Sequence, residues 1–295
     1  MTLSSIRTGQ YPQRDPSMVP FGAISTGRLS AKREEKSKDK PQRLMVYCKT
    51  GSTAKTIQAY ARYLAELLDT DLSDSQMTAR ENPTCEDLVK QAGLGADLII
   101  VEKLNQSFVS KLLLGSPECR AAARLKTSLL FARQPGWPLR RVLLVTRGQD
   151  RDNPAVDWLV RLARSSGAAV TVLALQPYMS AIQCQTLYGQ GLTTWLTTYT
   201  PLGQQLRRIV DQVVHGEIDS RLHLRFRQGT PDWQVRCETD EENYDLIIIA
   251  ADSASRWERR LPGEVVSPLL RWANRSVLIV KPPITNTSRI ASQVI

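Results

Sequence analysis

Two stretches of this chain share one pattern of apolar and polar positions. Each has a wholly apolar run, then a polar loop, then a glycine that opens a helix-like segment. The apolar runs lie within residues 96–101 and 244–250, each directly after an aspartate, and the glycines are Gly115 and Gly263. A continuous apolar run is typical of a strand buried on both faces, and a glycine at a helix entrance lets backbone N–H groups reach an anion. The pattern therefore predicts a duplicated scaffold with the layout of a phosphate site.

Further short apolar runs alternate with segments of helical periodicity. Strands are expected at residues 44–48, 98–101, 129–131, 142–145, 170–175, 222–226, 246–249 and 277–280. Helices are expected at residues 54–68 (capped by Ser52 or Thr53), 84–91, from Pro117 onward, 154–166, 202–214, 233–239 and 265–273. Residues 69–84 are polar and are interpreted as loop. Strands alternating with helices predict an α/β fold made of two open, mostly parallel, doubly wound sheets.

Composition divides the chain further. The 295 residues are 42% hydrophobic and 23% charged, as in ordinary globular proteins. Residues 1–41 are polar, lack apolar periodicity and are predicted to be a disordered basic arm. Two α/β domains are then expected at residues 42–135 and 138–283, followed by a flexible tail at 284–295. No apolar run approaches the roughly 18 residues of a membrane span, so a cytoplasmic protein without membrane insertion is expected.

The net charge and the reactive side chains bear on whether the protein binds nucleic acid, binds a metal or catalyses a reaction. The net charge of +10 suggests nucleic acid, but residues 1–43 hold nine Lys/Arg against four Asp/Glu, so half of the excess lies at one end. The five cysteines are widely spaced and form no Cys-x-x-Cys pair, which argues against zinc and disulfides. The chain has two histidines, His215 and His223. Because no nucleophile–base pair or Walker A loop can be named, the sequence predicts a protein that is not an enzyme.

From its first strand to its last, the second half resembles the universal stress protein domain. The matching segments are residues 141–145, 168–173, 229–231, 244–248 and 277–281. The first half resembles a shortened domain of the same family and keeps Leu112-Leu113-Leu114-Gly115-Ser116. The resemblance implies a tandem protein in which the last strands, 129–131 and 277–280, meet across an intrachain pseudo-dimer. Such pairing would also cover two apolar sheet edges.

The family resemblance also implies where an adenine nucleotide such as ATP would bind. Nucleotide-binding members carry an acidic residue after the first strand and a glycine-rich loop that ends in Gly-Ser or Gly-Thr. The candidate positions in this chain are Gly115, Ser116, Gly263 and Arg147. In the first half Glu102 and Asn105 replace the leading glycines, and Cys48 or Lys49 takes the acidic position.

In the second half the glycine-rich loop is altered more heavily. Ala251 and Ala254 replace the leading glycines, and Glu264 stands where the hydroxyl belongs. Arg147 takes the acidic position. Phosphate contacts from Arg147, Arg256, Arg259 and Arg260 would offset the carboxylates in part.

These features lead to one main hypothesis and two alternatives. The main one is a non-catalytic regulatory stress-response protein that binds a protein partner or itself and has at most degenerate adenine-nucleotide binding. The first alternative is a structural pair of domains that acts through protein contacts alone. The second is a basic nucleic-acid-associated protein. The long aromatic loop at residues 177–201, with Tyr178, Tyr188, Trp195 and Tyr199, is expected to pack on a neighbouring domain or to cover a ligand.

Overall fold

The computed structural model describes most of the chain between residues 43 and 282. The described residues are 43–70, 72, 77–80, 84–92, 96–102, 104, 117–176, 200–216, 218, 221–251 and 265–282. The expected basic arm, residues 177–199 of the aromatic loop and the C-terminal tail lie outside these ranges.

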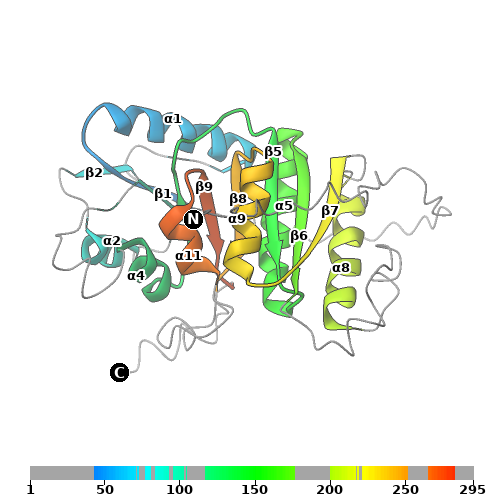
Figure 1. Cartoon of the computed structure of the whole chain (residues 1–295). Coiled ribbons are helices and arrows are strands. Elements are labelled where there is room, and N and C mark those ends of the chain that lie inside the picture. Colours follow the sequence, from blue (N-terminus) through cyan, green and yellow to red (C-terminus); the bar gives the residue numbers. More distant parts are fainter. Residues whose placement is uncertain are drawn as a thin grey trace, which may run out of the picture.

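One nine-stranded sheet forms the centre of the molecule (Figure 1). Its strand order is β2-β1-β3-β4-β9-β8-β5-β6-β7. Every neighbouring pair is parallel except β4 and β9, which are antiparallel. The strands are β1 (Leu44–Lys49), β2 (Met77–Arg80), β3 (Leu98–Val101), β4 (Ser128–Phe131), β5 (Arg141–Thr146), β6 (Ala169–Gln176), β7 (Leu222–Gln228), β8 (Leu246–Ala250) and β9 (Ser276–Val280).

Helices cover both faces of the sheet, because strands buried on two sides need an apolar layer on each. One face carries α1 (Ser52–Leu67), α5 (Asn153–Ser166) and α8 (Pro201–His215). The other carries α2 (Cys85–Ala92), α4 (Pro117–Arg124), α9 (Pro231–Glu241) and α11 (Val266–Trp272). Figure 1 shows the second group in front of the sheet. The α/β, mostly parallel fold is thus confirmed, with the two expected sheets joined edge to edge into one.

Local signals explain several element boundaries. Gly167 ends α5 at φ +71, as predicted, and its N–H donates to the Ala163 carbonyl. Thr84 precedes α2, and its hydroxyl accepts the Asp87 N–H at 3.2 Å. The expected cap of α1 was wrong, because Gly51 holds that position and makes no side-chain hydrogen bond. Residues 69–84 are not all loop: Met77–Arg80 forms β2, which pairs with β1.

The two halves of the sheet share one strand order. In the second half β5 lies between β6 and β8, with β9 beyond β8 and β7 beyond β6. In the first half β1 lies between β2 and β3, with β4 beyond β3, and β2 is the last strand at its edge. The described residues of the first half therefore repeat the order of the second, and none of them forms a strand at the place of β7.

The junction between β4 and β9 is symmetric in register. Leu130 lies opposite Leu278, and the flanking pairs are Leu129 with Ile279 and Phe131 with Val277. Each β4 residue corresponds to the β9 residue whose number is higher by 148. If every residue is replaced by its counterpart, the same three pairs result. A local two-fold axis of the strand pair therefore passes between Leu130 and Leu278, and the predicted pairing of the two last strands is confirmed.

Polar contacts on both sides of the junction obey the same symmetry. The Ser128 hydroxyl accepts the Lys281 N–H at 3.1 Å, and the Ser276 hydroxyl accepts the Arg133 N–H at 3.3 Å. The Lys281 ammonium donates to a carbonyl of α4 at 2.5 Å, and the Arg133 guanidinium donates to the Ala273 carbonyl after α11 at 2.8 Å. Cations favour helix C-termini because the carbonyls there lack helical partners. Each half thus supplies a cation that hydrogen-bonds to a carbonyl at the C-terminal end of a helix in the other half.

An ionic cluster fixes α9 against the edge strand β7. The Glu238 carboxylate is fully buried and accepts from Arg225 at 3.3 Å and from Arg227 at 3.0 Å. The Tyr244 hydroxyl donates to Glu238 at 2.6 Å. Burial, together with the hydrogen bond to Glu238, raises the pKa of Tyr244, so the phenol stays a donor. A buried carboxylate needs such partners, because an unpaired buried charge is costly.

Replacing the buried acid should destabilise the protein. In Glu238→Gln, Arg225 and Arg227 keep the exposed Glu241 but lose the buried one of their two shared carboxylates, and we expect a loss of about 3 kcal/mol in the free energy of unfolding. Chemical denaturation measures it. The control is Glu241→Gln, whose side chain is 53% exposed and should cost at most about 1 kcal/mol. Equal losses in the two variants would contradict a special role for the buried group.

Stability should also depend on the charge of Glu242 at acidic pH. Partial burial raises its pKa, but the hydrogen bond and charge of Arg141 and the charge of Arg225 outweigh that, so the pKa lies below its ordinary 4.5. A lowered carboxyl pKa stabilises the fold above the unfolded value, and this stability disappears as the pH falls through the folded value. Between pH 6 and about pH 3, wild type should therefore lose more unfolding free energy than Glu242→Gln. Parallel profiles would refute this.

Candidate functional site

The candidate site lies at the carboxyl ends of two neighbouring strands in each half, namely β5 with β8 and β1 with β3. In an open parallel sheet, ligands bind where the strand order reverses, because the loops on either side diverge there. These places are the ends of β5 and β8 in the second half and of β1 and β3 in the first. Figure 1 labels β5 and β8 of the second half and β1 of the first.

In the second half, one buried carboxylate organises the loop after β5. Asp152 is 1% exposed. Its Oδ2 accepts the Thr146 hydroxyl at 2.7 Å, the Arg147 N–H at 2.9 Å and the Gln149 N–H at 3.2 Å. The Gly148 N–H donates to the Thr146 hydroxyl oxygen at 3.2 Å. The N–H groups of Arg147, Gly148 and Gln149, which could otherwise bind an anion, therefore donate to side chains of the protein itself.

Helix α8 presses directly on this loop. Gly148 has φ +72, and a Cβ built there would lie 2.6 Å from the Leu202 Cα. A glycine is required on both counts, since side chains disfavour that φ and the backbone of α8 leaves no room. The close packing fixes the start of α8 beside the end of β5.

An open hollow of about 450 Å³ lies next to the loop, between its outer residues and α8. Arg208 donates to Asp150 across it at 2.6 Å. The Gln205 amide donates to Asn153 at 2.8 Å and ties the two helices together. The hollow presents amides and a guanidinium, groups that hydrogen-bond to anions and to polar ring edges. Its lining residues are Gly148, Gln149, Asp150, Gln204 and Arg208.

In the first half, a carboxylate occupies the same edge of the sheet. The Glu102 side chain accepts the Lys49 N–H at 2.8 Å, and the Glu102 N–H donates to the Tyr47 carbonyl at 3.0 Å. Burial, and secondarily the charge of Glu102, raises the pKa of the Cys48 thiol, which therefore stays protonated. A negative charge held over the end of β1 opposes the approach of a phosphate.

Of the predicted site residues, Arg147 is the one that the structure describes. It is half-buried at the exit of β5, and its N–H donates to Asp152. Gly115, Ser116 and Gly263 lie outside the described residues, as do Asn105, Ala254, Glu264 and the other candidate arginines. Their part in a site stays a prediction.

Sequence reasoning missed Asp152, Thr146 and Arg208. The first two carried a signal, because an acid just before the Asn153-Pro154 start of a helix can bond to the preceding turn. Arg208 carried none, since it reaches the loop from α8. Within the described ranges, no three His, Cys, Asp or Glu side chains gather as metal ligands. No described helix is long and apolar enough to cross a bilayer.

The strand order and the two helical layers define the class of doubly wound α/β proteins that bind ligands at strand ends. Within that class, residues 138–281 match the model of the universal stress protein family. The chain therefore carries a universal stress protein domain in its second half. A comparison with curated proteins found no match.

One solved structure shares the fold over most of the chain, and two others show lower similarity. A functionally unknown protein from Pseudomonas aeruginosa PAO1 is 16% identical, with 85% of this chain and 87% of that one covered and a TM-score of 0.51. A universal stress protein from Archaeoglobus fulgidus DSM 4304 is 13% identical, with 78% of each covered and a TM-score of 0.47. A universal stress protein in complex with cAMP is 22% identical, covering 48% and 96%, with a TM-score of 0.35.

Removing the carboxylate of Asp152 should loosen the β5 loop. Asp152→Ala leaves the buried Thr146 hydroxyl and the part-buried N–H groups of Arg147 and Gln149 without their acceptor, so we expect a loss of about 3 kcal/mol in the free energy of unfolding. Denaturant titration measures it. Asp150→Ala is the matched control, because that side chain is 87% exposed and should change stability by less than about 0.5 kcal/mol. A loss no larger than the control's would show that the loop is held by other contacts.

Proposed function

We propose that the protein is a non-catalytic regulatory protein of the universal stress type that acts through protein contacts and has degenerate adenine-nucleotide binding. The observation that carries the proposal is the use of internal carboxylates at both strand exits. Glu102 takes the Lys49 N–H in the first half, and Asp152 takes those of Arg147 and Gln149 in the second. A phosphate would meet engaged donors in both places.

We propose further that the chain is a tandem of two related domains, of which the first is shortened. The shared strand order supports this, as do the equal spacings between β3 and β4 and between β8 and β9. The symmetric contacts at Ser128 and Ser276 also support it, because equivalent residues of related units meet across a two-fold axis.

Adenine nucleotides are the ligands to test, because the family resemblance implies them. In the first half the retained Gly115-Ser116 pair would face the Glu102 charge. In the second half Arg147 would supply a positive charge beside Gly263, yet Glu264 follows that glycine. Each half thus combines favourable and opposing groups, which is the basis for proposing weak binding.

The alternative is a structural pair of domains that binds no nucleotide at all. Both hypotheses assign the protein a role through protein contacts, and they differ only in whether a nucleotide binds. Thermal unfolding of the full chain with ATP, ADP, AMP or cAMP discriminates between them, since a ligand of the native state must raise Tm with its concentration.

For degenerate binding we expect a small concentration-dependent shift. A ligand at its Kd stabilises by about 0.4 kcal/mol, which raises Tm by about 1 °C for domains of this size. We expect such a shift only at millimolar nucleotide. Saturation with a shift of several degrees at micromolar nucleotide would contradict degeneracy. No shift at 10 mM would favour the structural alternative.

A second variant tests the role of Glu102. Glu102→Gln removes the charge at the end of β1 while it keeps an acceptor for the Lys49 N–H. We expect a larger nucleotide-dependent Tm shift than in wild type. Glu86→Gln, on the exposed surface of α2, is the control and should match wild type. An unchanged shift in Glu102→Gln would show that this carboxylate is not the obstacle.

A further inference from the structure

Arginines gather at the edge of the sheet where the strands of the second half begin. These strands are neighbours in the order β9, β8, β5, β6 and β7, and because they are parallel they all start at this edge. Arg275, Arg140 and Arg221 directly precede β9, β5 and β7. Arg164 and Arg271 lie in the last turns of α5 and α11, shortly before β6 and β9 start. We call this edge the amino edge of the second half.

Backbone contacts and strand spacing place these arginines close together. The Arg140 carbonyl accepts the Ala169 N–H at 2.8 Å, which brings Arg140 beside the end of α5. A Cβ built on Gly167, the residue that ends α5, would lie 3.3 Å from the Arg221 Nη1. Arg275, Arg140 and Arg221 precede every second strand of the five. Since neighbouring strands are about 4.8 Å apart, these three positions are spaced by about 10 Å along the edge.

The side chains of the five arginines are available to a ligand. Arg140, Arg164 and Arg271 are exposed, and Arg221 and Arg275 are partly buried. Within the part of the chain that the structure describes, none of the five guanidinium groups makes an ion pair or a hydrogen bond. Each therefore keeps its donors for a partner from outside.

The acids of the second half at this edge are engaged within the protein. Asp245 accepts the N–H groups of Arg140 and Arg141 at 2.8 and 3.0 Å. Glu242 pairs with the Arg141 guanidinium at 2.7 Å, and Glu241 pairs with the arginines of β7. Of these three acids, Asp245 is the one without a cationic side chain as partner. The five unpaired guanidinium groups therefore leave the amino edge positive.

An exposed aromatic ring lies at the same edge. Residues 132–140 connect the end of β4 to the start of β5, and the antiparallel pairing of β4 with β9 brings both points to this edge. Within this connection Trp137 is 43% exposed. Its ring packs on Tyr60 of α1, with the ring centroids 6.0 Å apart, and the Tyr63 hydroxyl accepts the Leu139 N–H at 2.8 Å. Helix α1 thus holds the connection while part of the indole stays open to a ligand.

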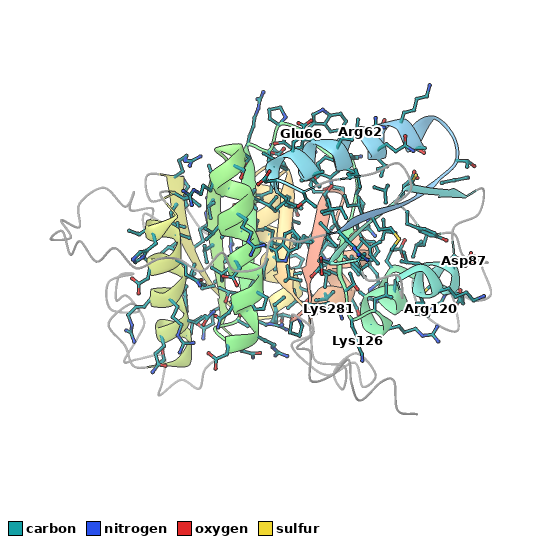
Figure 2. The ribbon with its side chains drawn as sticks, turned by 180° about the vertical axis from the view of Figure 1, so that it is seen from behind. Arg62, Glu66, Asp87, Arg120, Lys126 and Lys281 are labelled. Carbon is teal, nitrogen blue, oxygen red and sulfur yellow. The ribbon has the colours of Figure 1, made fainter. Side chains whose placement is uncertain are left out.

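The residue types indicate which anion fits this edge. Lys126 and Lys281 lie at the opposite edge, where β4 begins and β9 ends, and Figure 2 places both in the lower part of the molecule. The amino edge carries arginines, whose planar guanidinium forms paired hydrogen bonds to phosphate and stacks on rings. Phosphates and rings occur together in nucleic acids. A duplex turns its bases inward, whereas a single strand leaves them free to stack on an aromatic side chain.

We propose that the amino edge of the second half binds single-stranded nucleic acid. Arg140, Arg221 and Arg275 contact phosphates along the strand, and a base stacks on Trp137. Arg164 and Arg271 flank this path from the ends of their helices. The surface is separate from the hollow beside α8, which lies at the carboxyl end of β5.

Fluorescence anisotropy of the full chain with a labelled oligothymidylate of about 20 nucleotides tests the phosphate contacts. The triple variant Arg140→Gln, Arg221→Gln, Arg275→Gln should raise Kd at least about tenfold at low salt. It should also flatten the slope of log affinity against log salt by about 2, because each contact to a single strand contributes about 0.7. The control Arg124→Gln, Lys126→Gln, Arg236→Gln removes the same charge from exposed positions elsewhere and should stay within about twofold of wild type.

The variant Trp137→Ala tests the stacking contact. We expect Kd to rise about tenfold with an unchanged salt slope, since a stacked base is lost and no phosphate contact is. Trp137→Phe keeps an aromatic ring and should bind nearly as wild type, which separates lost stacking from a damaged connection. Trp233→Ala, at an exposed tryptophan of α9, is the matched control and should match wild type.

Five results would overturn the proposal. The first is no binding by wild type at about 50 mM salt. The second is an equal loss in the arginine triple variant and its control, which would reduce the effect to net charge. The third is an unchanged Kd in Trp137→Ala. The fourth is equal affinity for a duplex of the same length. The fifth is displacement by polyglutamate as effective as displacement by unlabelled oligothymidylate, which would assign the edge to an acidic protein segment.

Discussion

The antiparallel pairing of β4 with β9 is the interaction on which the rest of the structure depends. Both strands are wholly buried, so each would present an apolar edge if the other were missing. Their pairing joins the parallel strands of the two halves into one sheet and sets the two helical layers in register. Hydrogen bonds from Lys281 to α4 and from Arg133 to the end of α11 add polar contacts on both sides of this apolar strand pair.

The same backbone chemistry underlies the weak anion binding that we propose at the strand ends. N–H groups at loops and helix starts need acceptors, and a ligand or a side chain can supply them. Here Asp152 and Glu102 supply them from within the chain. The loops thereby gain order, and less donor capacity is left for a phosphate. Stability at these loops and ligand affinity are therefore in competition.

The sequence predicted most of the elements because their patterns are strong. Residues 98–101 and 277–280 are continuous apolar runs, and α5 has both an amphipathic face and a terminal glycine. Strand β2 was missed because Met77-Thr78-Ala79-Arg80 is short and mixed in polarity, and its backbone pairing with β1 is nonlocal. The Glu102–Lys49 contact spans 53 positions, and no local pattern reports such a distance. The glycines of the candidate site come from the loop pattern and the family resemblance and stay a prediction, whereas Asp152 owes its role to burial.

The local two-fold axis has a consequence for how such a chain can change in evolution. In a dimer of identical subunits, every substitution or deletion appears twice, on both sides of the axis. In this chain the two sides are encoded separately and joined by residues 132–140, so each can be altered alone. The first half has no counterpart of β7 among its described residues, while the second half keeps that strand and the ionic cluster that holds it. Covalent linkage keeps the two halves at high effective concentration, so a change on one side can be tolerated without loss of the pairing.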